Sequence, residues 1–137
     1  HGSTYGGNPV AAAVAQTALR VLVEEGMIEN SATLGEHVMQ RLRAIDTPHI
    51  KELRGRGLWI GIELHPEAGG ARRYCEALQR RGVLCKETHT HTIRMAPPLM
   101  ITREDLDWGL DQIEAVLRDP DAVAAEVSVE ATATTAG

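Results

Sequence analysis

The sequence predicts an α+β fold in which helices cover a small, mainly antiparallel sheet. Apolar residues recur at helical spacing over residues 9–45 and again near residue 106, whereas they alternate over residues 58–64. The expected order is two helices, then strand–strand–helix–strand–strand–helix, which suits one sheet with helices packed against it. The 137 residues, 43% of them hydrophobic, fit a single domain with a buried core.

Two helices are expected at the N-terminal end. Asn8 and Pro9 mark the first helix start, because an Asn side chain accepts hydrogen bonds from free backbone amides and Pro fits the first turn. The apolar pattern extends this helix over residues 9–25, and Gly26 is placed to end it. A second helix is predicted over residues 29–45 by the spacing of Leu34, Val38, Met39, Leu42 and Ile45.

The middle of the chain predicts a pair of strands. Residues 50–54 form a short strand, and Gly55-Arg56-Gly57 forms a turn. Residues 58–64 form a half-buried strand, because every second residue is apolar: Leu58, Ile60, Ile62 and Leu64. A loop over residues 66–70 follows.

A third helix is predicted over residues 71–81, ended by Gly82 and with Tyr74, Cys75 and Leu78 directed inward. Residues 83–86 and 92–95 are expected to form two more strands.

Thr102 is expected to cap a fourth helix, with Asp105 three residues further on as in a capping box. The apolar residues of this helix recur at intervals of four, three and four: Leu106, Leu110, Ile113 and Leu117. Residues 119–137 show no periodicity, and we expect a disordered tail there.

Composition argues against several classes of partner. The net charge is −5, and no basic block of the kind that binds nucleic acid or an anionic membrane is present. No apolar run approaches the ~18 residues of a membrane span, and the Gly-rich start is unlike a signal peptide. Two cysteines are too few for a disulfide framework. We therefore expect a cytoplasmic protein with no nucleic-acid or membrane partner.

The first nine residues, His1-Gly2-Ser3-Thr4-Tyr5-Gly6-Gly7-Asn8-Pro9, have the chemistry of an anion-binding turn. Glycines permit close backbone approach, Ser3 and Thr4 offer hydroxyl donors, and a helix start favours negative charge. A plain glycine loop that leads into a helix is the alternative, and spacing alone favours it.

This segment resembles the one that precedes the long interdomain helix in class III, fold-type I, pyridoxal-phosphate aminotransferases. The resemblance implies that Thr4, together with Ser3, binds the phosphate of pyridoxal 5'-phosphate held by the neighbouring subunit of a homo-oligomer. It therefore places the phosphate across a dimer interface, whereas the local pattern would place it over the chain's own helix.

Two further stretches carry the same resemblance, residues 53–64 (LRGRGLWIGIEL) and residues 92–99 (TIRMAPPL). The resemblance implies that Arg94 meets the substrate carboxylate and, in the ornithine enzymes of the family, also pairs with a glutamate of the large domain. An arginine suits the task because its planar fork donates two hydrogen bonds to a carboxylate. Without the motif, a surface arginine at a strand end is the preferred interpretation. Met95 departs from the family, where Phe is common.

The resemblance covers residues 1–118 and implies the C-terminal small domain of a fold-type I pyridoxal-phosphate-dependent transferase. Residues 1–8 would be the phosphate-binding turn, 9–49 the interdomain and second helices, 50–118 the small domain and 119–137 the tail. Residues 86–89 and 93–99 are most similar to ornithine aminotransferases. Those enzymes move the δ-amino group of ornithine to a 2-oxo acid, forming glutamate semialdehyde and an amino acid.

The chain has two lysines, Lys51 and Lys86, and neither lies in the family's Schiff-base context. The resemblance places the cofactor lysine, the pyridine-nitrogen Asp and the ring-stacking aromatic upstream of His1. We therefore expect no catalytic residue in this chain, no turnover by the chain alone, and a large-domain half or neighbouring subunit that carries the lysine. The alternatives are a non-catalytic remnant or binding domain, and part of an acetylornithine or 4-aminobutyrate aminotransferase.

Three residue pairs have less specific interpretations. His89 and His91 would share one face of a strand, but without an evident third ligand we expect no metal site. Cys75 and Cys85 are expected to be buried as small hydrophobes. Trp59 and Trp108 are expected to be core or interface anchors.

Overall fold

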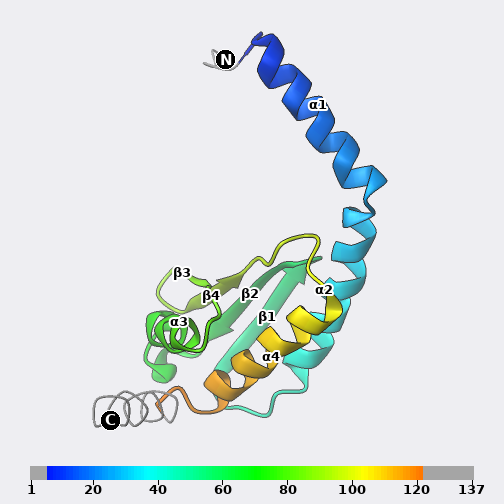
Figure 1. Cartoon of the computed structure of the whole chain (residues 1–137). Helices are drawn as coiled ribbons and strands as arrows, with labels where there is room; N and C mark the ends of the chain where they lie inside the picture. Colours follow the sequence, from blue (N-terminus) through cyan, green and yellow to red (C-terminus); the bar gives the residue numbers. More distant parts are fainter. Residues whose placement is uncertain (1–5, 122–137) are drawn as a thin grey trace, which may run out of the picture.

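A computed structural model describes residues 6–121, and this part of the chain has the expected α+β architecture (Figure 1). The predicted tail lies beyond Asp121, outside the described residues, apart from its first few positions. The elements are α1 (Pro9–Glu24), α2 (Met27–Arg43), β1 (Ile50–Arg56), β2 (Trp59–Leu64), the 3-10 turn η1 (Pro66–Ala68), α3 (Ala71–Arg80), β3 (Lys86–Thr88), β4 (Thr92–Met95) and α4 (Arg103–Arg118).

The four strands form one antiparallel sheet in the order β1-β2-β4-β3. β2 and β4 are central because the chain crosses through α3 after β2, forms the edge strand β3 and then returns beside β2. The predicted sequence of strands and helices is thereby confirmed.

Helices α2, α4 and α3 form a layer on one face of the sheet (Figure 1). The alternating apolar residues of β2 point into this layer, and Ile60, Ile62 and Leu64 are at most 1% exposed. The helices contribute most of the residues that the helical spacing indicated. Met39 and Ile45 are only partly buried, and Ile45 lies beyond the end of α2. The other residues are buried: Leu34, Val38 and Leu42 of α2, Tyr74, Cys75 and Leu78 of α3, and Leu106, Leu110, Ile113 and Leu117 of α4. Thr102 caps α4 as predicted, since its Oγ1 accepts from the Asp105 amide at 3.0 Å.

Two predictions about local structure are wrong. Gly55 and Arg56 belong to β1, and the turn contains only Gly57 and Leu58, because a glycine at φ 55° allows a two-residue hairpin connection. Residues 83–85 are not a strand, and β3 begins at Lys86. The amide of Val83 instead donates to the Leu78 carbonyl at 2.9 Å, as part of the end of α3.

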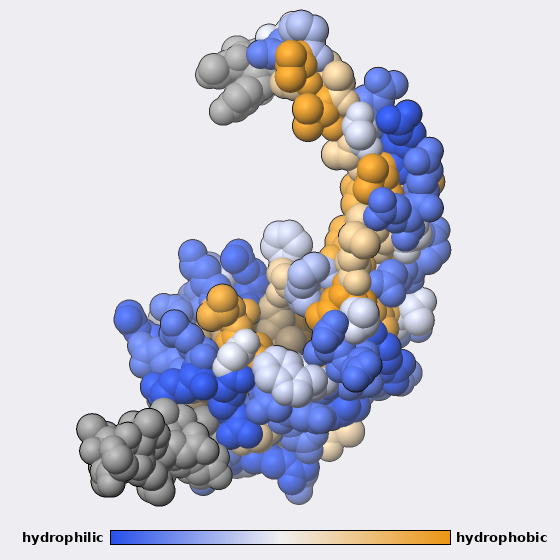
Figure 2. Space-filling view, in the orientation of Figure 1, coloured by the Kyte–Doolittle hydropathy of each residue, from blue (hydrophilic) through white to orange (hydrophobic). Residues whose placement is uncertain are grey.

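Helix α1 extends away from the sheet and its helices (Figure 1). Its start is confirmed, because the Asn8 side chain accepts from the amides of Val10 and Ala11 at 2.9 and 3.2 Å. None of its residues is buried, and apolar side chains cover much of its visible surface (Figure 2). Within residues 6–121, no helix has the length and apolar character that crossing a bilayer requires.

The β1–β2 turn meets helix α2 through two glycines. A Cβ built on Gly35 of α2 would overlap the backbone carbonyl of Gly57, and a Cβ on Gly57 would come within 2.5 Å of Ser31 Oγ. The Leu58 amide donates to the same Ser31 hydroxyl at 3.2 Å. The helix backbone can therefore approach the turn this closely only because both positions lack side chains.

The sheet face opposite the helices carries an ion-pair cluster. Glu63 of β2 accepts from Lys51 Nζ and from Arg54 Nη1, each at 2.6 Å, and Glu52 lies 3.3 Å from the same Arg54 nitrogen. Hydrogen bonds from Lys51 and Arg54 lower the pKa of Glu63 to about 2. The Glu63 carboxylate is therefore ionised at any pH at which the protein is commonly studied.

Substituting Gly35 by alanine should destabilise the fold. The new methyl group would overlap backbone that has no rotamer to change, and overpacking of this kind costs about 1–3 kcal/mol. Gly109→Ala in α4 is the matched control, since its Cβ position has no atom within 4 Å and alanine gains up to about 1 kcal/mol of helix propensity. Urea unfolding followed by circular dichroism measures both, and equal effects would contradict the close approach.

The Glu63 cluster should stabilise the fold in a pH-dependent way. Because the folded-state pKa of about 2 lies below the ordinary value of 4.5, the carboxylate's contribution is complete above pH 4.5 and is lost as the pH falls towards 2. The difference in unfolding free energy between wild type and Glu63→Gln should therefore be greatest at pH 7 and shrink below pH 4.5. Urea titrations at pH 7, 4 and 3 test this, with Glu36→Gln on the exposed side of α2 as the control. A difference that does not change with pH would refute the assignment.

Candidate functional site

A row of three cationic residues crosses the uncovered face of the sheet. The register pairs Arg54 with Gly61, Gly61 with Arg94, and Arg94 with Lys86, from one edge strand to the other. Directly paired residues in antiparallel strands project from the same face. The cations Arg54, Arg94 and Lys86 therefore share one face, and the missing side chain of Gly61 leaves a gap between the two arginines.

A pocket of about 460 Å³ opens over this gap, a volume typical of small-molecule sites. Its base includes Gly61 and the buried Thr92, and its walls come from both ends of the sheet. Arg56 and Trp59 line it from the β1–β2 hairpin, and His89 lines it from the β3–β4 turn. A methyl group on Gly61 would lie 3.5 Å from Arg54 Cγ, so any side chain there would occupy the base of the pocket.

The arginines of the pocket differ in their partners. Arg54 is bound to Glu63 and lies 3.4 Å from Thr92 Oγ1, so its charge is largely compensated. Arg94 and Arg56 are exposed, and among residues 6–121 no carboxylate pairs with either. Two arginines that have no carboxylate partner among residues 6–121 and lie beside a small cavity favour an anionic ligand, above all a planar carboxylate.

The three site residues predicted from the sequence fall into two groups. Arg94 lies in the pocket, on an exposed position of β4, as a carboxylate-binding residue requires. Ser3 and Thr4 lie outside the described residues. Further along the chain, the Asn8 side chain accepts hydrogen bonds from the amides of Val10 and Ala11, in the first turn of α1. An anion placed directly over this helix would need these same donors.

Neither lysine has the setting of an amine nucleophile. Lys51 donates to Glu63, and this hydrogen bond raises the pKa of Lys51, which keeps the amine protonated at neutral pH. Lys86 is exposed on the edge strand β3, at the end of the cationic row. The pocket can bind and orient an anion through its own cations, Arg54, Arg56 and Arg94.

His89 and His91 do not share a strand face, because the β3–β4 turn contains both of them and His89 has a φ of 49°. Within the described part of the chain, no three His, Cys, Asp or Glu residues form a group that could hold a metal ion. The expected burial is confirmed for Cys75, which is 7% exposed, whereas Cys85 is half-buried.

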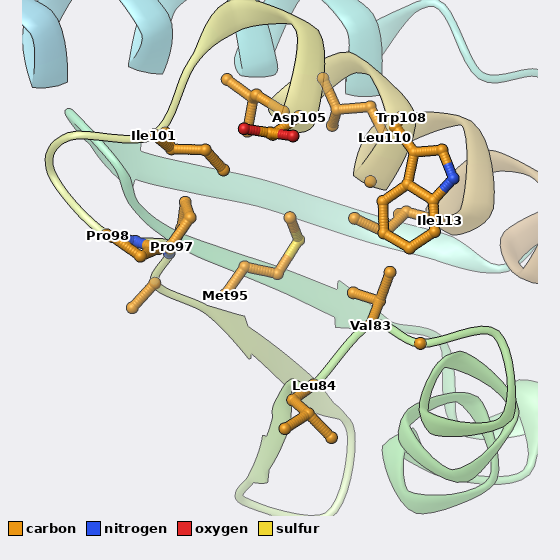
Figure 3. Close-up of a pocket in the computed structure, with 14 residues that line it drawn as sticks. Val83, Leu84, Met95, Pro97, Pro98, Ile101, Asp105, Trp108, Leu110 and Ile113 are labelled. Atoms are coloured by element: carbon orange, nitrogen blue, oxygen red, sulfur yellow. The ribbon is translucent and has the colours of Figure 1, made fainter.

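Trp59 and Trp108 are not core residues, as they are 67% and 53% exposed. Trp59 lines the basic pocket, while Trp108 lines a second, apolar cavity between α4 and the segments around Val83 and Pro97. Figure 3 shows the side chains of Met95, Val83 and Trp108 directed towards this second cavity. Its one ionisable lining residue, Asp105, accepts from Thr102 Oγ1 at 2.7 Å, so the cavity offers little to a polar ligand.

Reasoning from sequence identified Arg94 but missed the residues around it. Arg54, Arg56 and Gly61 belong to the same pocket, and only the strand register brings them beside Arg94. The alternation of residues 58–64 places Gly61 on the face opposite Ile60 and Ile62. This alternation was the one feature of the sequence that could have indicated a gap on the open face of the sheet.

Comparison with known proteins identifies the family of the chain. The model of the family "Aminotransferase class-III" matches residues 1–117. The curated ornithine aminotransferases of Bordetella pertussis and of an Exiguobacterium species are 56% and 59% identical to the chain over 117 residues. Each alignment covers 85% of this chain and 28% of the relative, so the chain spans less than a third of the length of these enzymes.

Solved structures of aminotransferases are also similar to this chain. The ornithine aminotransferase of Plasmodium yoelii superposes with a TM-score of 0.81 and 37% identity, covering 88% of this chain and 32% of that one. The acetylornithine aminotransferase of Elizabethkingia anophelis has a TM-score of 0.78 and 40% identity, covering 85% and 32%. Since the family model matches most of its length, the chain belongs to the class III aminotransferases.

Proposed function

We propose that this chain is the C-terminal part of an ornithine aminotransferase and that its pocket on the open sheet face receives a substrate carboxylate. The observation that carries the proposal is Arg94, which has no carboxylate partner within residues 6–121 and lies beside a cavity, in a chain 54–59% identical to curated ornithine aminotransferases. The complete enzyme would transfer the δ-amino group of ornithine to a 2-oxo acid.

The surroundings of Arg94 support a role in orienting the substrate. The guanidinium can donate two parallel hydrogen bonds to a carboxylate, which fixes both position and rotation. Arg54 cannot serve equally well, because Glu63 already accepts from it at 2.6 Å. Gly61 leaves room for the ligand between the two arginines. A glutamate of the large domain would pair with Arg94 when no substrate is bound.

We propose that the complete enzyme uses pyridoxal 5'-phosphate, which supplies an electron sink for amino-group transfer when it is bound. Ser3 and Thr4 would donate hydrogen bonds to the cofactor phosphate of a neighbouring subunit. The capping of α1 by Asn8 supports this arrangement, because the helix has fewer free amides for a phosphate of its own. The cofactor-binding lysine would come from a large-domain half or a neighbouring subunit, as Lys51 is bound to Glu63.

We also propose that the chain consists of a small domain and a connecting segment. Residues 50–118 would be the small domain, and residues 9–49 would connect it to the rest of the enzyme. Helix α1 supports this assignment, because four of its large apolar residues have exposed fractions of 63–70%: Val10, Val14, Leu19 and Val23. In the complete enzyme this surface would pack against the large domain and a second copy, which makes a homo-oligomer the active form.

A chimeric enzyme tests the proposed function. The matched 117-residue segment of the Bordetella pertussis enzyme is replaced by residues 1–117 of this chain, and ornithine-dependent transamination is measured. We expect activity within about tenfold of the parent, because the segments are 56% identical. A chimera that folds and binds cofactor but has no transaminase activity would favour a non-catalytic remnant. Preference for acetylornithine or 4-aminobutyrate would assign another substrate within the family.

In the active chimera, Arg94→Lys should lower kcat/KM for the carboxylate substrate by roughly 10- to 100-fold, since lysine keeps the charge but loses the two-pronged geometry. Arg94→Gln should lower it further, because one partner of a charge-assisted pair is then missing. Arg80→Gln, an exposed arginine of α3 that does not line the pocket, is the matched control and should leave kcat/KM unchanged. Equal effects at both positions would exclude a carboxylate contact at Arg94.

Thr4→Val in the same chimera should weaken cofactor binding by about tenfold or more, because it removes a hydroxyl donor to a charged phosphate while preserving side-chain shape. Titration of the apoenzyme with pyridoxal 5'-phosphate, followed by absorbance, measures the affinity. Thr90→Val, at an exposed position of the β3–β4 turn, is the control. If the two variants bind the cofactor equally well, Thr4 has no role in holding its phosphate.

A further inference from the structure

The two cysteines of the chain lie together although ten positions separate them. Cys75 lies on the inward side of α3, and Cys85 lies in the segment without regular structure that leads into β3. Both line one surface pocket, whose rim carries Arg72, Glu76 and Glu87. Their thiols interact directly, side chain to side chain.

We propose that Cys75 and Cys85 form a redox-active dithiol that a small hydroperoxide converts to an intrachain disulfide. The argument rests on three features: the two thiols are in contact, both border a solvent-accessible pocket, and the chain has no other cysteine to compete. The inference is independent of the proposed transaminase function, because it concerns the helix-covered side of the sheet and needs no cofactor.

The burial of Cys75 limits the size of the oxidant that can reach its sulfur. Cys75 is only 7% exposed, so a bulky disulfide such as oxidised glutathione has poor access to its sulfur. Hydrogen peroxide is close to water in size and can enter the pocket shared by the two thiols. A hydroperoxide is therefore the class of oxidant that this geometry favours.

The order of events follows from the contact between the thiols. The hydrogen bond from Cys85 lowers the pKa of Cys75, whereas the same interaction and burial raise the pKa of Cys85. Cys75 is thus the sulfur that ionises first, and Cys85 keeps its proton. Since the thiolate is the nucleophile, Cys75 is the attacking residue and Cys85 is the resolving one.

The Cys75 thiolate attacks one peroxide oxygen, the O–O bond breaks, and the leaving hydroxide takes a proton to become water. The Cys75 sulfenic acid is then attacked by the Cys85 sulfur, which loses its proton as the S–S bond forms and a second water leaves. Two thiols and one hydrogen peroxide give one disulfide and two waters. The peroxide gains the two electrons that the sulfurs lose.

The local backbone permits closure of the bond. A disulfide needs its sulfurs at about 2.05 Å, so one side must move towards the other. Cys85 lies before the first paired residue of β3, and its segment is held to α3 by the hydrogen bond from the Val83 amide to the Leu78 carbonyl. The movement can therefore occur at Cys85 without breaking the strand pairs of β3.

The test uses the purified 137-residue chain, fully reduced and then titrated with hydrogen peroxide. We expect loss of both maleimide-reactive thiols together, a monomer lighter by about 2 Da, and recovery of both thiols with dithiothreitol. The disulfide would also raise the melting temperature by roughly 5 °C or more, because it closes a loop between α3 and β3. Oxidation to species heavier by oxygen with no loss of about 2 Da, or disulfide-linked dimers as the main product, would overturn the proposal.

Cys85→Ser and Cys75→Ser separate the two roles. In Cys85→Ser the remaining Cys75 should form a sulfenic acid that dimedone traps, because no resolving thiol is present. In Cys75→Ser the remaining Cys85 should react at least about tenfold more slowly, because its proton is retained. Equal trapping rates at the two positions would contradict the assigned order. If either variant fails to fold, the peroxide titration of the wild type alone still decides whether the disulfide forms.

Discussion

The contact between the backbones of Gly35 and Gly57 determines where the helix layer lies on the sheet. Since neither residue has a side chain, α2 can lie directly on the β1–β2 turn, and the Ser31 hydroxyl accepts a hydrogen bond from the Leu58 amide within that turn. This fixes the hairpin that carries Arg54 and Arg56 relative to the hydrophobic core. The core in turn occupies one face of the sheet only, which leaves the other face free for polar residues.

Charge on that free face is distributed unevenly: it is compensated around Glu63 and positive at the pocket. Glu63 lies between Lys51 and Arg54 and binds both, so this edge of the face is close to neutral. Positive charge that no carboxylate of the described residues compensates remains at Arg56 and Arg94, in the pocket. A pocket whose arginines were all paired would have little attraction for an anion, and one with all of them free would not select a position for it.

Much of the fold could be predicted from the sequence, because helical and alternating spacings are local properties. Leu106, Leu110, Ile113 and Leu117 are buried as their spacing indicated, and Thr102 caps α4. The strand predicted for residues 83–85 is absent, because a short apolar run is compatible with a strand and with the segment that leaves a helix. The core alternative for Trp59 and Trp108 is wrong because it rested on residue type alone, which does not determine exposure in a given chain, whereas their role as interface anchors stays a prediction.

The site was less predictable, for a physical reason. Arg94 could be found because it lies in a contiguous motif. Gly61 lies beside it only through a strand pair whose members are more than thirty positions apart, and Arg54 lies nearby only because it pairs with Gly61. Register depends on the whole sheet and on the hairpin turn, so it is not encoded at any one position.

The uncovered helix α1 has a consequence for how such a polypeptide survives in a cell. A segment with large aliphatic side chains exposed on several turns is the kind of surface that chaperones and proteases recognise in incompletely assembled proteins. In the proposed complete enzyme, a copy of this chain made apart from the large-domain half would either be bound by that complement or be degraded. Its abundance would then follow the supply of that complement rather than its own rate of synthesis.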